Sequence, residues 1–181
     1  MICVTNRHLV EGDYFEQIKK VIKAQPGAIV LREKDLSEQA YEQLAKQVIP
    51  LCKQGNVPLV LHYYTNVAIC LKHPALQVPF KVLQKMTEDE KAMFSELGCA
   101  IHAVEEAREA QALGATYLVA GHIYETQCKN GLPGRGISFL QEVCRAVSIP
   151  VYAIGGISTA NLPECIKAGA KDGMMMSGYM R

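Results

Sequence analysis

Short apolar runs alternate with longer amphipathic segments along the whole chain, and this alternation restricts the possible folds more than any other feature. Short apolar runs are typical of buried strands, and an apolar residue at every third or fourth position is typical of a helix. The expected strands are Ile2–Thr5, Ala28–Leu31, Leu59–Leu61, Ala75–Val78, Cys99–His102, Tyr117–Ala120, Val151–Ile154 and Gly173–Met176. The expected helices are Tyr14–Ala24, Ser37–Gln54, Asn66–Lys72, Lys81–Glu96 (as one helix or two pieces), Val104–Leu113, Ile137–Val147 and Thr159–Ala168.

Strands that are mostly followed by helices predict the α/β class, and eight of them predict a parallel (β/α)8 TIM barrel. A doubly wound open sheet is the alternative, since strand order and closure do not follow from the pattern. A short internal repeat favours the barrel, which is built from repeated units. The segments Leu113–Thr116 and Ala168–Lys171 are similar, and in each a glycine ends a helix before a strand. We expect one domain over residues 1–181, with the last helix missing and a homodimer covering the seam left bare.

Composition excludes several classes of protein. The formal net charge of +1 gives no reason to expect a nucleic-acid partner, and no apolar run is long enough to span a membrane. The first residues lack the layout of a signal peptide. Seven cysteines without a CxxC pair favour reduced thiols in a cytoplasmic protein over disulfides or a zinc site.

A long polar, glycine-rich loop at Gly121–Gly136 follows the buried run Tyr117–Ala120. In parallel α/β folds, ligands bind at the carboxyl ends of the strands, where this loop begins. His122 stands where an imidazole would transfer protons near neutral pH, although a single histidine is more often structural. Thr126 and Lys129, in the same loop, are expected to help hold an anion.

Two further loops carry glycines at the ends of the seventh and eighth strands. Gly155 and Gly156 follow one strand, and Ser177 and Gly178 follow the other. Glycine lets backbone amides approach a ligand closely, and these are the two loops that hold phosphate in many barrels. We therefore expect a phosphate site here, with simple tight turns as the alternative.

Basic and imidazole side chains end other strands. Arg32 and Lys34 share one face at the end of the second strand, where they would attract an anionic substrate or form an ordinary charged loop. His62, at the end of the third strand, is expected to face the substrate. His102, at the end of the fifth, is expected to support the site indirectly. No spacing of residues predicts a metal site.

These motifs together resemble the thiamine phosphate synthase/TenI superfamily over nearly the whole chain, from about Thr5 to Met180. The markers are Leu31–Asp35, Gly121–Lys129, Ile149–Ile157 and Ala168–Ala170. The resemblance implies a (β/α)8 barrel with a phosphate held by the Gly155–Gly156 and Ser177 loops. It also implies one of two activities, a magnesium-dependent thiamine phosphate synthase or a metal-independent thiazole tautomerase of the TenI type.

The acidic residues of the synthase pattern are missing here. Synthases carry Asn-Asp-Arg after the third strand, where this chain has His62-Tyr63-Tyr64, and a second aspartate after the fourth strand, where Leu76–Lys81 contains no acid. Magnesium prefers oxygen ligands, so the resemblance implies an enzyme without a metal or other cofactor.

The loop after the sixth strand is similar to the TenI type, which has Gly-His followed by Glu-Thr-x-Cys-Lys. By contrast, Arg32-Glu33-Lys34 is closer to the synthases. The sequence therefore predicts a thiazole tautomerase, an isomerase with His122 as the acid or base, that binds a thiazole phosphate carboxylate through Arg32, Lys34 and Lys129. The alternatives are a thiamine phosphate synthase, which is a transferase, and a non-catalytic TenI-like regulator or ligand-binding protein.

Overall fold

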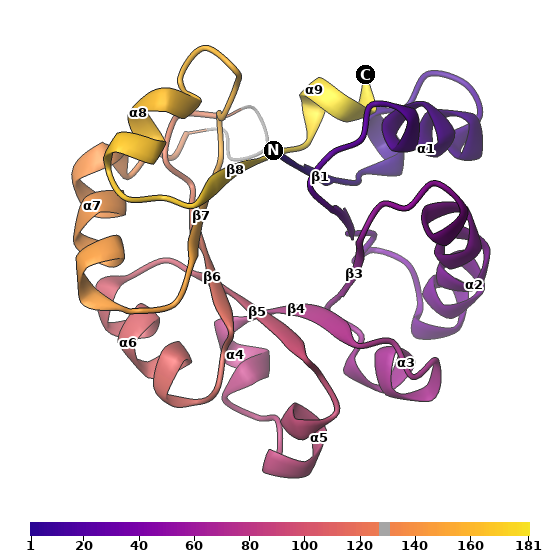
Figure 1. The fold of residues 1–181 in the computed structure, drawn as a ribbon, viewed down its shortest axis with the longest axis horizontal. Helices are drawn as coiled ribbons and strands as arrows, with labels where there is room; N and C mark the ends of the chain where they lie inside the picture. The colour runs from indigo at the N-terminus through magenta and orange to yellow at the C-terminus, as the bar shows by residue number, and fades with distance from the viewer. Residues whose placement is uncertain (127–130) are drawn as a thin grey trace.

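Eight parallel strands pair in chain order, and the last strand pairs with the first, which closes a barrel. In the computed structural model, which describes residues 1–126 and 131–181, the strands are β1 (Ile2–Val4), β2 (Ile29–Leu31), β3 (Leu59–His62), β4 (Ala75–Pro79), β5 (Glu96–Ile101), β6 (Tyr117–Gly121), β7 (Val151–Ile154) and β8 (Asp172–Met175). Figure 1 shows the barrel end on, with the helices around it. The predicted (β/α)8 barrel is confirmed. The open sheet is excluded because β8 pairs with β1.

The connections between strands are mostly helical. They are η1, a 3-10 turn (Arg7–Leu9), α1 (Tyr14–Lys23), α2 (Glu38–Gln54), α3 (Thr65–Cys70), α4 (Phe80–Leu83), α5 (Glu88–Ala92), α6 (Val104–Ala112), α7 (Gly136–Ala146), α8 (Leu162–Lys167) and α9 (Ser177–Met180). None of the helices within residues 1–126 and 131–181 combines the length and the apolar character that a membrane crossing requires.

The segment expected as a helix over Lys81–Glu96 is two short helices, α4 and α5. The Thr87 side chain accepts a hydrogen bond from the backbone N–H of Glu90, whose carboxylate accepts one from the N–H of Thr87. This capping box begins a new helix at Glu88. Glu96 itself belongs to β5, so that strand starts three residues before the expected Cys99 and the helical prediction for Glu96 is wrong.

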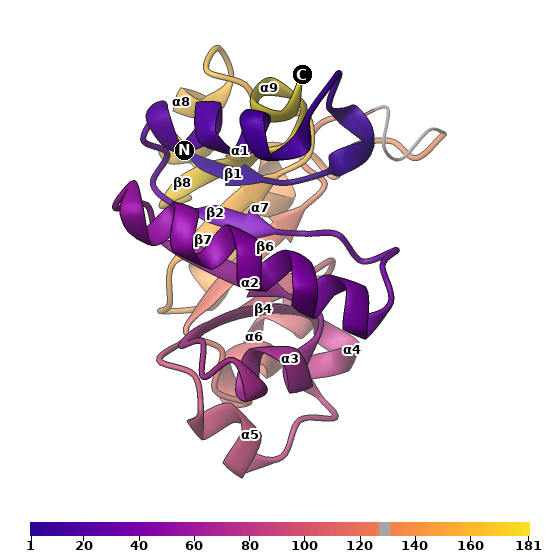
Figure 2. The same ribbon diagram turned by 90° about the vertical axis from the view of Figure 1, so that its right-hand side faces the viewer.

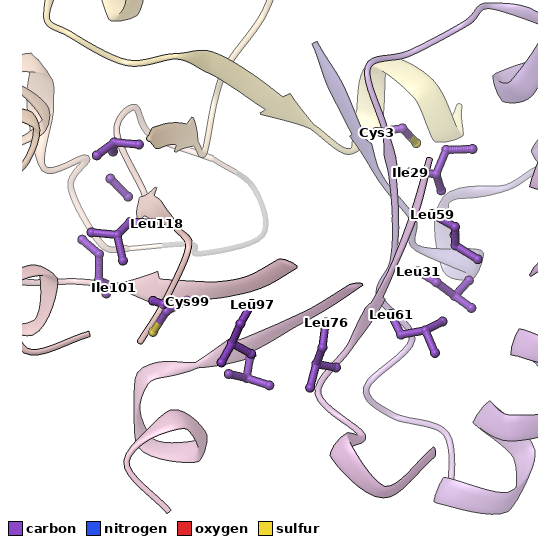
Figure 3. Packing of buried hydrophobic residues seen from close by; sticks show 14 of the residues in the cluster. Cys3, Ile29, Leu31, Leu59, Leu61, Leu76, Leu97, Cys99, Ile101 and Leu118 are labelled. Atoms are coloured by element: carbon purple, nitrogen blue, oxygen red, sulfur yellow. The ribbon is translucent and has the colours of Figure 1, made fainter. Parts of the chain in front are cut away.

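Alternation along the strands separates two apolar layers. The side chains of Ile29, Leu31, Leu59 and Leu61 point away from the barrel axis and pack under the helices, as Figure 3 shows. A second cluster, formed by inward-facing residues that include Val30 and Val60 as well as Val4, Val119 and Met174, fills the barrel. Continuing this alternation by two residues places Arg32 and His62 on the inner face at the mouth.

The expectation that the last helix is missing is wrong. Residues 177–180 form α9, a single turn that contacts α1 and η1, and the side chain of Met180 is fully buried. The side-chain amide of Gln17 on α1 donates a hydrogen bond to the Tyr179 carbonyl at 2.6 Å. Figure 1 shows α9 between β8 and α1, and Figure 2 shows α1 and α2 side by side along the outside of the barrel. Part of the seam is therefore covered within this chain.

Candidate functional site

A cavity of about 210 Å³ opens at the carboxyl ends of the strands, between β2 and the run β5 to β8. Its wall includes Ile154, Met174 and Met176, which give it an apolar surface. The predicted site residues that the structure brings together on this wall are Arg32, His122, Thr126, Gly155, Gly156 and Ser177. The cavity thus combines a cation, an imidazole and the two glycine loops around an apolar floor.

His122 follows directly after β6, and only 7% of its surface is exposed. Its Nε2 lies 3.3 Å from the Leu132 carbonyl oxygen. Because a carbonyl can only accept a hydrogen bond, Nε2 carries the hydrogen in this contact. In the neutral ring, Nδ1 then holds a lone pair, and this buried atom has no hydrogen-bond partner among the described residues. The side chain, which lines the cavity, therefore holds a proton acceptor that no described residue engages.

Backbone hydrogen bonds hold the chain on both sides of this imidazole. The N–H of Arg135 donates to the His122 carbonyl at 2.9 Å, and the N–H of Ile123 donates to the Ile154 carbonyl of β7 at 2.9 Å. Both the residue before α7 and the last residue of β7 therefore bind the segment His122–Ile123 through backbone hydrogen bonds. The position of His122 is therefore set by the barrel and not by a free loop.

Gly155 lies against the same histidine. Its φ is +99°, and a Cβ built on it would lie 2.3 Å from the Cβ of His122 and 2.8 Å from its Cα. Such a contact is far inside van der Waals distance, and the backbone conformation favours glycine. The glycine of the predicted phosphate loop thus also lets the chain after β7 pack closely against the Cα and Cβ of His122.

Glu33 is a site residue that the sequence analysis missed. Its side chain is buried, and its carboxylate accepts hydrogen bonds from the Thr5 hydroxyl at 2.8 Å and from the backbone N–H of Arg7 at 3.1 Å. The Thr5 hydroxyl oxygen in turn accepts the N–H of Arg32 at 2.9 Å. Nothing in the motif around Arg32 indicated this, because Thr5 follows β1 and Arg7 begins η1, and both are far away in sequence. Glu33 fixes the backbone from which Arg32 projects.

An exposed ion-pair cluster covers the outside of this junction. Arg7 pairs with Asp35 through Nη1 at 2.8 Å, and the Nε2 of His8 lies 2.8 Å from the same carboxylate. Donation by Arg7 and His8 holds the pKa of Asp35 well below its usual range. The loops after β1 and β2 are thereby fastened together at the mouth.

His62 occupies the inner face at the end of β3 and is 5% exposed. Burial, and then the positive charges of Arg32 and Lys34, lower its pKa from 6.5 to about 3, so its ring is neutral near pH 7. Its Nδ1 has no hydrogen-bond partner in the described part of the chain. His62 does not lie on the wall of the cavity. Neither do the exposed Lys34 and Gly178.

Two other positions complete the comparison with the sequence. His102, expected to act only indirectly, lies on the cavity wall itself, with Nδ1 2.7 Å from the Gly121 carbonyl oxygen. Lys129 lies outside the residues that the structure describes.

The residues at the mouth do not fit a magnesium ion. Where the synthases carry aspartates, this chain has His62 at the end of β3, followed by Tyr63, and Val78 and Pro79 at the end of β4. Glu33, the buried carboxylate nearby, is already engaged by Thr5 and Arg7. Within residues 1–126 and 131–181, no three His, Cys, Asp or Glu side chains gather as a set of metal ligands. Hard oxygen ligands are what Mg²⁺ requires.

Comparisons with known proteins agree with the fold and the motifs. A family model described as thiamine monophosphate synthase matches residues 1–179. The chain is 33% identical to thiamine-phosphate synthase 2 of Streptococcus pneumoniae serotype 4, over 92% of this chain and 80% of that protein. It is 29% identical to thiamine-phosphate synthase of Syntrophomonas wolfei, over 98% of this chain and 86% of that protein.

Among solved structures, the chain is similar to a thiamine phosphate pyrophosphorylase from Pyrococcus furiosus. The TM-score is 0.81, with 24% sequence identity over 97% of this chain and 84% of that one, and this likeness shows the fold. The names of the relatives favour the synthase alternative over the tautomerase, whereas the residues at the mouth lack the synthase carboxylates.

Proposed function

This chain belongs to the thiamine monophosphate synthase family, and we propose that it is an enzyme of thiamine biosynthesis that binds a thiazole phosphate in the cavity beside His122. The reaction that we propose is tautomerisation of a thiazole phosphate carboxylate. The observation that carries this proposal is the position of His122 on the cavity wall, with a buried Nδ1 that has no hydrogen-bond partner in residues 1–126 and 131–181.

In the proposed reaction His122 is the group that removes the ring proton. The Nδ1 lone pair takes a proton from a carbon of the non-aromatic ring, and the electrons of the broken C–H bond move into the ring. A proton returns at the exocyclic carbon, so the substrate gains and loses one proton and becomes aromatic. The apolar wall of Ile154, Met174 and Met176 suits the ring and excludes water from it.

The phosphate and the carboxylate of the substrate both need hydrogen-bond donors or positive charge in the cavity. We propose that backbone amides of Gly155, Gly156 and Ser177 hold the phosphate, and that Arg32 faces the carboxylate. Thr126 lies on the cavity wall. The other proposed contributors do not line the cavity (Lys34, His62 and Gly178) or lie outside the described residues (Lys129).

A thiamine phosphate synthase is the second candidate, because the relatives carry that name. The strand ends of this chain do not offer the carboxylates that would hold magnesium for it. A non-catalytic ligand-binding protein is a third possibility, which predicts binding of the thiazole phosphate without turnover.

Two parallel assays separate these candidates. In the first, the purified protein is mixed with the non-aromatic thiazole phosphate carboxylate, and aromatisation is followed by absorbance. In the second, it is mixed with the pyrimidine pyrophosphate, thiazole phosphate and Mg²⁺, and thiamine phosphate is measured. We expect turnover in the first assay only. Turnover in the second alone would establish the synthase, and binding without turnover in either would establish the ligand-binding protein.

The predicted homodimer stays a prediction. Its original argument was a bare seam, and α9 covers part of that seam within one chain. Light scattering decides the question, since a dimer has twice the 19.9 kDa mass of the chain.

A further inference from the structure

We propose that His102 is a second proton-transfer group of the cavity and that it works together with His122. This inference rests on the proposed tautomerisation. It gives a catalytic function to a residue for which the sequence predicted only indirect support.

The fold places two imidazoles on one wall. His102 follows the end of β5, His122 follows the end of β6, and these strands are neighbours in the barrel. Both side chains line the same cavity. His102 is linked to His122 through the backbone, because its Nδ1 lies 2.7 Å from the carbonyl oxygen of Gly121, the residue before His122.

This contact fixes which nitrogen of His102 is available to a substrate. The Gly121 carbonyl can only accept, so Nδ1 of His102 carries the hydrogen. Nε2 is therefore the nitrogen that gains or loses a proton during a reaction. In His122 the assignment is reversed, because Nε2 donates to the Leu132 carbonyl and Nδ1 is the acceptor.

The two rings differ in their contact with solvent. His122 is almost fully buried, whereas His102 is exposed to solvent. The charged and titratable groups around His102 are Glu106 on α6, whose carboxylate accepts the His102 backbone N–H at 2.6 Å, and Arg32 and His122 on the cavity wall. An exposed imidazole beside a buried one suits a pair in which one group takes the substrate proton and the other supplies a new one.

The proton balance is complete with this pair. Nδ1 of His122 removes the ring proton, and the imidazolium form of His102 delivers a proton from Nε2 to the exocyclic carbon. His122 then releases its proton to water, and His102 takes one from water. The substrate is isomerised, and both histidines return to their starting forms.

The decisive variant is His102→Asn. An asparagine amide reaches the place of Nδ1 and can still donate to the Gly121 carbonyl, but it cannot transfer a proton. We expect kcat for aromatisation to fall by about 10²-fold with KM little changed, and the pH–rate profile to lose one limb. His73→Gln is the matched control, because His73 contacts the Leu59 carbonyl at the start of β3, away from the cavity, and its rate should equal that of the unmodified protein.

Three outcomes decide the matter. Full activity of His102→Asn beside slow turnover by His102→Ala would mean that His102 only positions the Gly121 carbonyl, which overturns the inference. If His102→Asn does not fold, as judged by circular dichroism, His102→Gln takes its place, and full activity there overturns the inference equally. Absence of aromatisation by the unmodified protein would instead overturn the proposed function, so the two failures are distinguishable.

Discussion

The hydroxyl of Tyr41, on α2, accepts a hydrogen bond from the backbone N–H of His62, at the end of β3, at 2.8 Å. The same hydroxyl donates to the Leu31 carbonyl at the end of β2 at 2.7 Å. One fully buried side chain therefore satisfies a donor and an acceptor at the ends of two neighbouring strands. Past this point Arg32 and His62 project toward the mouth, so α2 supports the site from behind.

Replacing Tyr41 with Phe removes that hydroxyl and keeps the ring. The Leu31 carbonyl and the His62 N–H are then buried without partners, which costs about 1–3 kcal/mol for each group left unsatisfied. We expect the free energy of unfolding, measured by urea titration, to fall by about 2 kcal/mol or more. Tyr63→Phe is the control, because the Tyr63 ring is exposed. The free energy of unfolding of this variant should fall only slightly. Equal stability of the two variants would contradict the bridging contact.

Stability should depend on pH through His62. Its pKa is about 3 in the folded protein and about 6.5 when unfolded, so the unfolded chain binds one more proton between these values. The contribution of the neutral ring is present above pH 6.5 and is lost as the pH falls toward 3. The free energy of unfolding should drop by up to about 1.4 kcal/mol per pH unit in this window from His62 alone.

His62→Gln tests this assignment, because it keeps a polar side chain but removes the titration. Its free energy of unfolding should fall less steeply between pH 6.5 and 4 than that of the unmodified protein. Proton NMR of the unmodified protein gives a direct check, since the His62 ring signals should not shift near pH 6.5. A midpoint near that value would contradict the buried, neutral imidazole.

Gly155→Ala should impair the site through His122. The added methyl group would lie 2.3 Å from the Cβ of His122, and the segment after β6 must move to relieve it. Displacements of about 1 Å cost roughly 10²-fold in rate, so we expect a loss of that order. Gly12→Ala is the matched control. Its φ is +102°, close to that of Gly155, but its new Cβ would meet no atom within 4 Å. If the aromatisation rate falls by the same factor in both variants, strain in the backbone is the cause, and contact with His122 is not.

Removing divalent ions should leave aromatisation unchanged. The ends of β3 and β4 lack the carboxylates that the synthase pattern needs for magnesium, and the proposed proton transfer requires no Lewis acid. The measurement is the rate in excess chelator against the rate with added Mg²⁺. A rate that falls with chelator and recovers with Mg²⁺ would favour the synthase.

The barrel and much of the site were predictable because they depend on local pattern. Strand alternation places Arg32 on the inner face, and the loop after β6 places His122 at the carboxyl end of the barrel. Glu33 was missed because its function depends on Thr5 and Arg7, which are distant in sequence. His102 was expected to act only indirectly, because its contact with Gly121 does not follow from the local pattern. The helical turn α9 was missed because four residues are too short for a helical period, and packing on α1 stabilises it.

His122→Ala tests the proposed mechanism most directly. The backbone bonds from Arg135 and to Ile154 do not involve the imidazole, so the segment should keep its place. Removing Nδ1 takes away the proton acceptor, and general acid–base groups contribute about 10²–10⁴-fold to rate. We expect kcat for aromatisation to fall by that factor, while thiazole phosphate binding, measured by calorimetry, survives because Gly155, Gly156 and Ser177 are intact. Full activity of the variant would move the proton transfer to His102. Loss of fold and binding together would make His122 a structural residue and remove the basis for the tautomerase.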